Sequence, residues 1–391
     1  MNVGVVIPVF SRIPIALCES ITNFTRHTLS WHICLHRSDI HFLQPFLTLC
    51  RDLQTNPHVK MVNRGLSRTW NDGIVDTVFS GCDIVIICND DIIFKPGAFD
   101  EFVEHARNAK QYGITTCFGE EDFCGKKTPV CQGFAVFAIS IETILTVGFF
   151  DENISPAYFE DVDYEFRCNL SGRETYCAQQ VLVEHERNGS SKISETIRLL
   201  INENKVKNEL YMIAKWDIEL RDRYIARYKS PFNSGVGNKI CFADRLFPYG
   251  QGRDRDDLYI FNKTLHDYNV KAYFSGDPHI SYNGFVSDGI ALISRIGDQS
   301  VLYGPYCYMD KGYYELTVLG TWSSVCHSIC DIAKNIGEQI KVFDLPEDVE
   351  KRCLFNFELE YPASNFEVRL FIDPKDTIRF IGYRLRRIYN L

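Results

Sequence analysis

The chain has 391 residues, of which 45% are hydrophobic and 13% aromatic, and its net charge is −9 at pH 7. This length favours two domains, and the composition excludes a disordered protein. The negative charge argues against a general nucleic-acid-binding protein, which needs a basic surface. The first predicted strand begins almost at Met1, so we expect no cleaved signal peptide, and no apolar run has the length of a transmembrane helix.

The fifteen cysteines are scattered singly through strand-like and helix-like segments. No CxxC pair occurs, and Cys326 with Cys330 lacks a second pair nearby. In a chain of this size the pattern indicates buried free thiols rather than a disulfide scaffold. We therefore predict a reducing, cytoplasmic compartment, in solution or peripheral to a membrane.

The first 195 residues alternate strand-like and helix-like segments. Strands are predicted at 3–10, 32–35, 59–62, 84–88, 134–139 and 181–184, and helices at 40–53, 67–79 and 193–216. This alternation predicts an α/β domain with a parallel-type sheet and helices on its faces. The long last helix is expected to close the domain.

The second part of the chain has a different pattern. From Pro231 to Gly237 the composition changes to Pro, Asn, Ser and Gly, which is typical of a linker. Beyond it, short strands separated by glycine turns are predicted, for example at 313–318, 354–359, 366–372 and 377–383. Such spacing predicts a β-sandwich. We therefore expect two domains, residues 1–235 and residues 236–391.

The most informative segment is the apolar strand at 84–88, which ends directly on Asn89, Asp90 and Asp91. In parallel sheets, ligands bind beyond the carboxyl ends of the strands. Alternation points Asn89 and Asp91 to one side and Asp90 to the other. Oxygen-bearing side chains on one side suit a hard divalent cation that carries phosphates. The residues alone leave an equal alternative, an Asx turn that merely ends the strand.

Six groups of residues occur in order over the first 235 positions. They are Val6–Phe10; Asn63–Ser67 with Asn71–Gly73; Asn89–Asp91; Gly148–Glu152 with Tyr158–Asp163; His185; and Tyr211, Lys215–Trp216 and Pro231–Phe232. Together they resemble the family 2 type of GT-A glycosyltransferase, in its rhamnosyl- and galactofuranosyl-like branch. The resemblance implies a GT-A (Rossmann-like) mixed sheet with flanking helices, followed by an accessory all-β sandwich.

The resemblance also implies an activity and a set of site residues. A sugar such as rhamnose, galactofuranose or glucose would move with inversion from a UDP- or dTDP-sugar donor to a hydroxyl of a glycan or glycoconjugate acceptor. Asp161 would be the general base, a role worth about 10²–10⁴ in rate. Asp91 and His185 would bind Mn²⁺ or Mg²⁺, and Glu160 and Asp163 would lie on the acceptor side. The donor-binding residues would be Pro8, Val9, Phe10, Asp39, Asn63, Asn71, Asn89 and Asp90.

Each of these assignments has a plainer alternative. The acids at 160–163 also suit the start of a helix, where they favour the dipole, and the spacing of Phe159, Phe166 and Leu170 supports a helix there. A lone histidine such as His185 is ordinarily a core or surface residue. The segment from Cys117 to Cys131 is predicted as a loop beside the acceptor. Residues 36–39 depart from the family's D-x-S-x-D run, which leaves the nucleotide base open.

Three other functions would each need a sequence feature that differs from what this chain has. A sugar nucleotidyltransferase would normally carry a Gly-rich basic loop after the first strand, where this chain has Ser11-Arg12-Ile13-Pro14. A dinucleotide dehydrogenase would need G-x-G-x-x-G after a strand. A sugar-binding protein without activity would be favoured by the loss of a key acid, yet Asp91, Asp161 and His185 are all present. The sandwich could bind carbohydrate through exposed aromatics, although buried aromatics explain the same residues more simply.

Overall fold

The chain forms two compact units in a computed structural model, and the described parts of these units lie within residues 1–228 and 270–388. The described residues are 1–10, 12–36, 40–60, 63–123, 126–185, 195–216, 218–221, 225–228, 270–277, 279–287, 290–294, 302–323, 328–335, 337–373 and 377–388. The predicted linker at 231–237 and the domain boundary after residue 235 lie outside these ranges.

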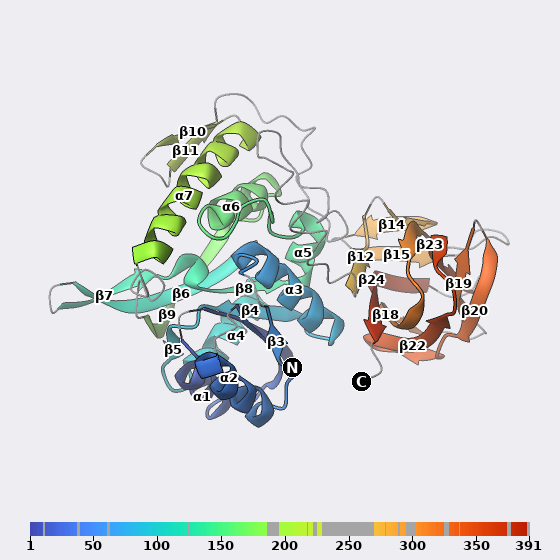
Figure 1. Cartoon of the computed structure of the whole chain (residues 1–391), viewed down its shortest axis with the longest axis horizontal. Helices are drawn as coiled ribbons and strands as arrows, with labels where there is room; N and C mark the ends of the chain where they lie inside the picture. The colour runs from blue at the N-terminus through green and yellow to red at the C-terminus, as the bar shows by residue number, and fades with distance from the viewer. Residues whose placement is uncertain are drawn as a thin grey trace. The chain divides into compact units, whose positions relative to one another are not determined.

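The first unit is built on a nine-stranded sheet with helices packed around it (Figure 1). Its strands are β1 (Asn2–Val9), β2 (Thr28–Leu35), β3 (His58–Val59), β4 (Ile84–Cys88), β5 (Ile92–Phe94), β6 (Ile114–Phe123), β7 (Lys126–Cys131), β8 (Val136–Ser140) and β9 (Thr175–His185). Its helices are α1 (Ile15–Thr22), α2 (Ile40–Asp52), α3 (Leu66–Phe79), α4 (Ala98–Asn108), α5 (Ile141–Val147), α6 (Glu160–Leu170) and α7 (Glu195–Trp216). A short 3-10 helix, Gly133–Ala135, precedes β8, and a small ribbon, β10 (Ile218–Arg221) with β11 (Ile225–Tyr228), follows α7.

Strand direction changes across this sheet. The strand order is β3-β2-β1-β4-β8-β6-β9-β5, with β7 paired to β6. The first four strands of that order are parallel, β8 runs antiparallel to β4 and β6, and β5 runs antiparallel to β9. The predicted mixed α/β sheet with flanking helices is therefore confirmed, and the parallel pattern expected from the apolar runs holds for β1 to β4.

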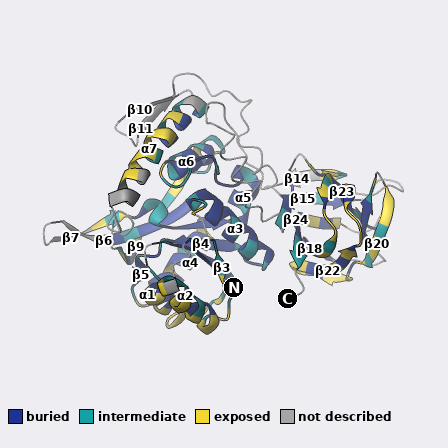
Figure 2. Cartoon of the chain, viewed as in Figure 1, coloured by how far each residue is buried: buried dark blue, intermediate teal, exposed yellow. Residues whose placement is uncertain are grey.

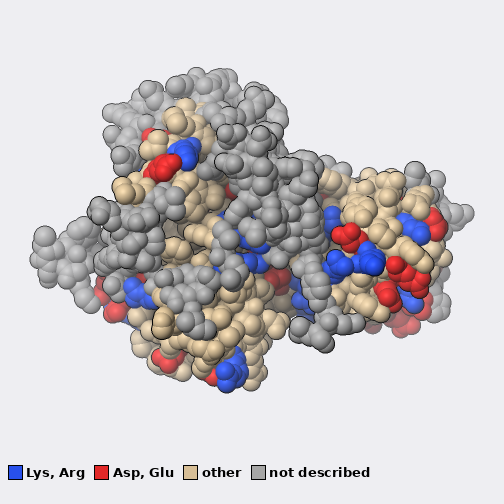
Figure 3. Space-filling view, viewed as in Figure 1, with Lys and Arg blue, Asp and Glu red and all other residues tan. Residues whose placement is uncertain are grey.

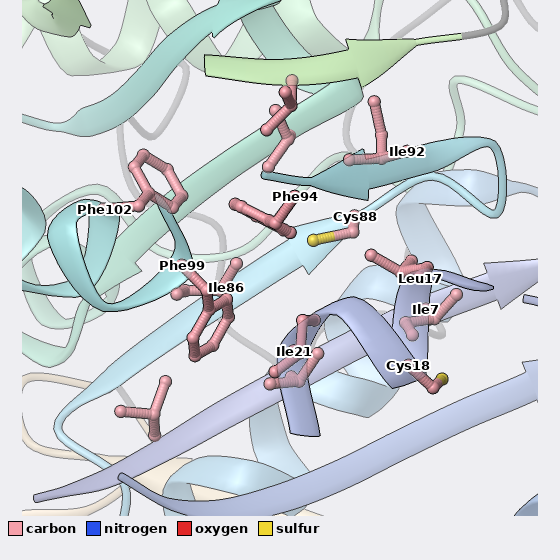
Figure 4. Packing of buried hydrophobic residues seen from close by; sticks show 14 of the residues in the cluster. Ile7, Leu17, Cys18, Ile21, Ile86, Cys88, Ile92, Phe94, Phe99 and Phe102 are labelled. Carbon is pink, nitrogen blue, oxygen red and sulfur yellow. The ribbon is translucent and has the colours of Figure 1, made fainter. Parts of the chain in front are cut away.

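The core of this unit explains why β4 reads as a continuous apolar run. All five residues of β4 are buried, because helices cover both faces of the sheet. Figure 4 shows Ile7 of β1, Ile86 of β4 and Phe94 of β5 packed with Leu17 of α1 and Phe99 of α4. Burying each such side chain stabilises the fold by about 1.5–3 kcal/mol. The central strands are dark in Figure 2, whereas the outer side of α7 is largely exposed.

One predicted element was wrong. The segment from Cys117 to Cys131, expected as a loop, is mostly a β-hairpin in which β6 pairs antiparallel with β7. Its glycine, acidic residues and Pro129 are weak strand formers, so local propensity favoured a loop. Pairing of β6 with β8 and β9 overrides that propensity.

The free thiols agree with the sequence. No disulfide bond links the cysteines of the described ranges, and most of these cysteines are buried. Among the same residues, no helix combines the length and the apolar character needed to cross a lipid bilayer.

The second unit is all β. Its strands are β12 (Val270–Phe274), β13 (Ser281–Tyr282), β14 (Gly284–Ser287), β15 (Ile290–Ser294), β16 (Leu302–Tyr303), β17 (Pro305–Met309), β18 (Gly312–Ser323), β19 (Ile329–Lys334), β20 (Glu338–Asp344), β21 (Asp348–Val349), β22 (Arg352–Leu359), β23 (Ala363–Phe371) and β24 (Thr377–Ile388). They form a seven-stranded and a six-stranded antiparallel sheet.

A single core joins these two sheets. Leu316 of β18 and Leu385 of β24 belong to the same buried cluster as Ile332 of β19 and Val368 of β23, which come from the other sheet. The predicted sandwich is thus confirmed. Acidic and basic side chains are interspersed on the face of this unit seen in Figure 3. Among the described residues of this unit, four tyrosines are exposed: Tyr306, Tyr308, Tyr313 and Tyr361.

Candidate active site

The carboxyl end of β4 is tied to the segment that follows β1. Oδ2 of Asp90 accepts hydrogen bonds from the backbone N–H of Phe10 at 2.9 Å and of Arg12 at 3.2 Å. The backbone N–H of Asn89 donates to the carbonyl of Ala135 at 2.9 Å. Asp90 therefore shapes the loop after β1 rather than offering both oxygens to a ligand.

Asp91 points toward a different strand, as the alternation of side chains predicts. The antiparallel pairing of β5 with β9 sets Ile92 opposite His185 and so brings the neighbouring Asp91 to the histidine. Oδ1 of Asp91 lies 3.4 Å from Nε2 of His185. Both side chains are about nine-tenths buried, and Oδ1 of Asp91 has no hydrogen-bond partner. The predicted metal pair is therefore together in space.

Gln132, which follows β7, fixes the orientation of this histidine. Its Nε2 donates to the carbonyl of Val130 at 3.0 Å, and its Oε1 lies 2.6 Å from Nδ1 of His185. Because an amide oxygen only accepts, Nδ1 carries a proton, and Nε2 is the ring nitrogen that faces Asp91. Gly119 leaves room for Gln132, since a Cβ at residue 119 would lie 2.3 Å from Nε2 of the glutamine.

This arrangement is compatible with a cation site. A carboxylate oxygen and an imidazole nitrogen face each other at 3.4 Å in a buried position, and a cation between them could bind both. A carboxylate oxygen and an imidazole nitrogen together form a ligand set that suits Mn²⁺ or a related divalent ion. The hydrogen bond from the outer nitrogen of the imidazole to Gln132 is the kind of support that metal-binding histidines usually have.

The other acids of the predicted site lie at the start of α6. Burial raises the pKa of Asp161. The N–H of Val162, which donates to its Oδ1 at 2.8 Å, and the Lys205 cation act in the opposite direction but do not outweigh burial. Burial and the neighbouring Asp161 raise the pKa of Glu160, whose Oε2 is buried without a partner. Desolvated carboxyls with raised pKa values are suited to proton transfer near neutral pH.

A strained turn positions these two acids. Tyr158 and Phe159 both have positive φ, 75° and 76°, a region that costs a non-glycine residue of the order of 1–3 kcal/mol. The fully buried Asn208 of α7 holds the turn by donating from Nδ2 to the carbonyls of Ala157 at 2.9 Å and Tyr158 at 3.0 Å. Helix α7 thus supports the conformation from which α6 begins.

Asp163 has a different environment from its neighbours. It is fully buried; its Oδ1 accepts from Nζ of Lys215 at 2.6 Å and Nε1 of Trp216 at 2.8 Å, and its Oδ2 accepts from Nε of Arg167 at 3.0 Å. Burial raises the pKa of Asp163, but the Lys215 and Arg167 cations outweigh that effect and hold it below its usual value. Lys215 also donates to Oδ2 of Asp151 at 2.8 Å. Asp163 therefore anchors α7 to α6 through these contacts, and its place on the acceptor side stays a prediction.

The predicted donor-binding residues lie in different environments. Asn71 is buried and is bonded to the N–H and carbonyl of Phe150 and to Glu152, so it holds the 148–152 segment. Asn63 is exposed and caps a turn through Gly65. Pro8 and Val9 are buried in β1. Asp39 lies outside the described residues.

The sequence did not predict a role for three residues that support the candidate site: Gln132, Asn208 and Lys215. Gln132 and Asn208 are single amides whose contacts are 53 and about 50 residues away in the chain, so no local pattern marks them. Lys215 does have a signal, because it lies within the tail motif, but its two carboxylate partners could not be read from spacing alone.

Comparisons with known proteins find similarity over part of the chain. No family model matches it. A galactofuranosyl glycosyltransferase of Leishmania donovani is 38% identical over 40% of this chain and 46% of that protein, so the chain spans about half the length of this relative.

Among solved structures, the mannosyltransferase PcManGT from Pyrobaculum calidifontis in complex with GDP-Man and Mn²⁺ has a TM-score of 0.37 at 13% identity, covering 53% of this chain and 64% of the other. S. aureus TarS 1-349 in complex with UDP has a TM-score of 0.36 at 12% identity, covering 55% and 72%. The chain is thus similar, over part of its length, to a galactofuranosyl glycosyltransferase.

Proposed function

We propose that the chain is a metal-dependent, inverting glycosyltransferase that uses a nucleotide-diphosphate sugar, with UDP-galactofuranose as the first donor to test. The observation that carries the proposal is the buried Asp91–His185 pair, whose carboxylate oxygen and imidazole nitrogen face each other at 3.4 Å and are suited to bind a cation. The name of the Leishmania relative supports the choice of sugar. A glycan or glycoconjugate hydroxyl is the proposed acceptor.

Asp161 is the proposed general base. In a single displacement, the acceptor oxygen bonds to the anomeric carbon while the bond from that carbon to the diphosphate breaks and Asp161 takes the hydroxyl proton. One displacement inverts the anomeric centre. The raised pKa of Asp161 makes its carboxylate a stronger base than that of an exposed aspartate.

The cation site serves the leaving group. Asp91 and His185 would hold Mn²⁺ or Mg²⁺, which when bound supplies positive charge to the departing diphosphate. Gln132 keeps the imidazole in the tautomer that leaves Nε2 free for the ion, and Gly119 gives Gln132 its space. Asp90 holds the loop at residues 10–12 beside this strand end through two backbone N–H groups.

The anchor between α6 and α7 keeps the base in place. Lys215 bridges Asp151 and Asp163, which lie on either side of the strained turn, while Asn208 holds the turn itself. Precise placement of a base relative to its substrate accounts for much of its effect on rate, so a rigid start of α6 favours catalysis.

Binding of UDP with and without Mn²⁺ tests this function. We expect wild-type protein to bind UDP only weakly without the ion, and Asp91→Asn to abolish the Mn²⁺-dependent gain, with His185→Ala weakening it less. The exposed Asp52, at the end of α2, gives a matched control in Asp52→Asn. Mn²⁺-dependent binding of wild-type strength in Asp91→Asn, or no turnover of any UDP-, dTDP- or GDP-sugar, would contradict the proposal.

A further inference from the structure

A second group of metal-ligating side chains lies near the other edge of the sheet. It consists of His32 of β2, His58 of β3 and Asp76 of α3, and one ligand atom from each lies within 4.8 Å of the others. In the strand order, β3 and β2 are at one end and β9 and β5, which carry His185 and adjoin Asp91, are at the other. The two groups of side chains are therefore separate.

The fold brings the three residues together for identifiable reasons. His58 is paired with Cys34, and His32 is two residues before Cys34, so alternation puts both histidines on one face of the sheet. Helix α3 approaches that face closely at Gly73, where a Cβ would lie 2.4 Å from Cγ1 of Val6 and 3.1 Å from Cδ2 of His32. Asp76 is three residues after Gly73 and so lies on the same side of the helix.

The distances suit a transition-metal ion. Oδ2 of Asp76 lies 2.9 Å from Nδ1 of His32 and 3.9 Å from Nε2 of His58. Tetrahedral coordination with bonds of about 2.0–2.1 Å separates ligand atoms by about 3.4 Å, a value that these two distances bracket. The imidazole centroids are 4.0 Å apart with a 32° tilt, so small rotations would bring both nitrogens to one ion.

The burial of these three side chains also fits a metal site. The His32 side chain is only 3% exposed, whereas His58 and Asp76 are 29% and 30% exposed, which gives an ion a route from solvent. Nε2 of His32, the ring nitrogen that does not face Asp76, is buried without a hydrogen-bond partner.

We propose that His32, His58 and Asp76 bind a divalent transition-metal ion of the zinc class, with water completing its coordination. Two imidazoles and one carboxylate are a zinc-type donor set, whereas Mg²⁺ favours oxygen ligands alone. The ion would tie α3 to β2 and to the two-residue strand β3. Since α3 also carries Asn71, which holds the 148–152 segment, occupancy would stiffen the support of the candidate active site.

Zn²⁺ and Co²⁺ binding to the full chain tests the proposal, with no nucleotide present. The measurements use metal-stripped protein in the Asp91→Asn background, which removes the other cation site. We expect one tightly bound Zn²⁺, a tetrahedral Co²⁺ absorption spectrum and a higher Tm with Zn²⁺. His58→Gln and Asp76→Asn should weaken binding by more than about 100-fold, since loss of a supporting group alone costs about 10–100-fold.

Asp76→Asn retains an oxygen that can accept from His32, so it is the variant that should keep the fold. His105→Gln is the matched control, because His105 lies on α4 and contacts Tyr176 instead. Zn²⁺ affinity equal to the parent in either His58→Gln or Asp76→Asn, with circular dichroism unchanged, would overturn the proposal. So would the absence of Zn²⁺ binding in the parent, whatever the protein does with UDP.

Discussion

Two groups of buried acids in the first unit differ in how their oxygens are satisfied. In the anchor, Asp151 and Asp163 accept hydrogen bonds from Tyr211, Lys215, Trp216 and Arg167 and are neutralised by two cations. In the candidate active site, Asp91 and Glu160 each leave an oxygen without a partner, and Asp161 has a raised pKa. Both groups are buried, so burial does not distinguish them. We infer that the acids of the motifs divide into structural and chemical ones according to whether hydrogen bonds and cations satisfy their carboxylate oxygens.

Loss of the base should have the largest effect. Asp161→Asn retains size and polarity but cannot accept the acceptor proton, so we expect turnover to fall by about 10²–10⁴ while UDP affinity changes by less than about threefold. Steady-state kinetics with titration of UDP checks both values. Glu165→Gln, one turn later on α6, is the control and should retain activity. Full activity in Asp161→Asn, with activity lost in Glu160→Gln, would move the role to Glu160.

Loss of the anchor should affect stability more than chemistry. Lys215→Met leaves two buried carboxylates with one remaining cation, so we expect a loss of about 3–5 kcal/mol in the free energy of unfolding, measured by urea denaturation. Lys207→Met removes an exposed lysine on the same helix and should change stability by less than about 0.5 kcal/mol. Equal stability of the two variants would remove the distinction between the two groups of acids.

A smaller effect should follow from crowding Gln132. Gly119→Ala would push the amide away from His185, and we expect Mn²⁺ affinity to fall by about 10–100-fold, as measured by calorimetry. Gln132→Glu is the informative companion, because a carboxylate still accepts from Nδ1 and should preserve binding. Unchanged affinity in Gly119→Ala would show that the support from Gln132 has no effect on the ion.

The pH dependence of kcat also tests the assignment of Asp161 as the base. Asp161 acts as a base only when its carboxyl is ionised, and burial raises the pKa of that carboxyl. The acid limb of the kcat profile should therefore lie at a higher pH than an exposed aspartate would give. Below the pKa of Asp161, kcat should fall tenfold per pH unit. A pH–rate profile measures this, and the limb should vanish in Asp161→Asn. A limb at the ordinary aspartate pKa would indicate that the base is hydrated.

Local patterns were sufficient where neighbouring residues decide the structure. The strand Ile84–Cys88 was predicted to the residue, because complete burial leaves an uninterrupted apolar run. Helix α2 was predicted to within one residue. The hairpin of β6 and β7 was missed because its residues favour a loop, and long-range pairing determines the outcome.

The candidate site was predictable in part for the same reason. The order of motifs singled out Asp91 and His185, and strand pairing brings them together. Asn71 and Asp163 come from the same motifs, but Phe150 lies 79 residues from Asn71 and Lys215 lies 52 residues from Asp163, so spacing could not reveal these contacts. Distant contacts, rather than the identity of the residue, decide which acids and amides remain available for chemistry.

The turn at Tyr158 and Phe159 has a consequence for protein engineering. Its two left-handed residues are unfavourable alone and persist because Asn208 and the surrounding structure hold them. A six-residue graft of the acidic motif onto another scaffold would therefore relax and point its aspartate elsewhere. A graft would have to carry the turn and the acids together with Asn208 of α7, which restrains them.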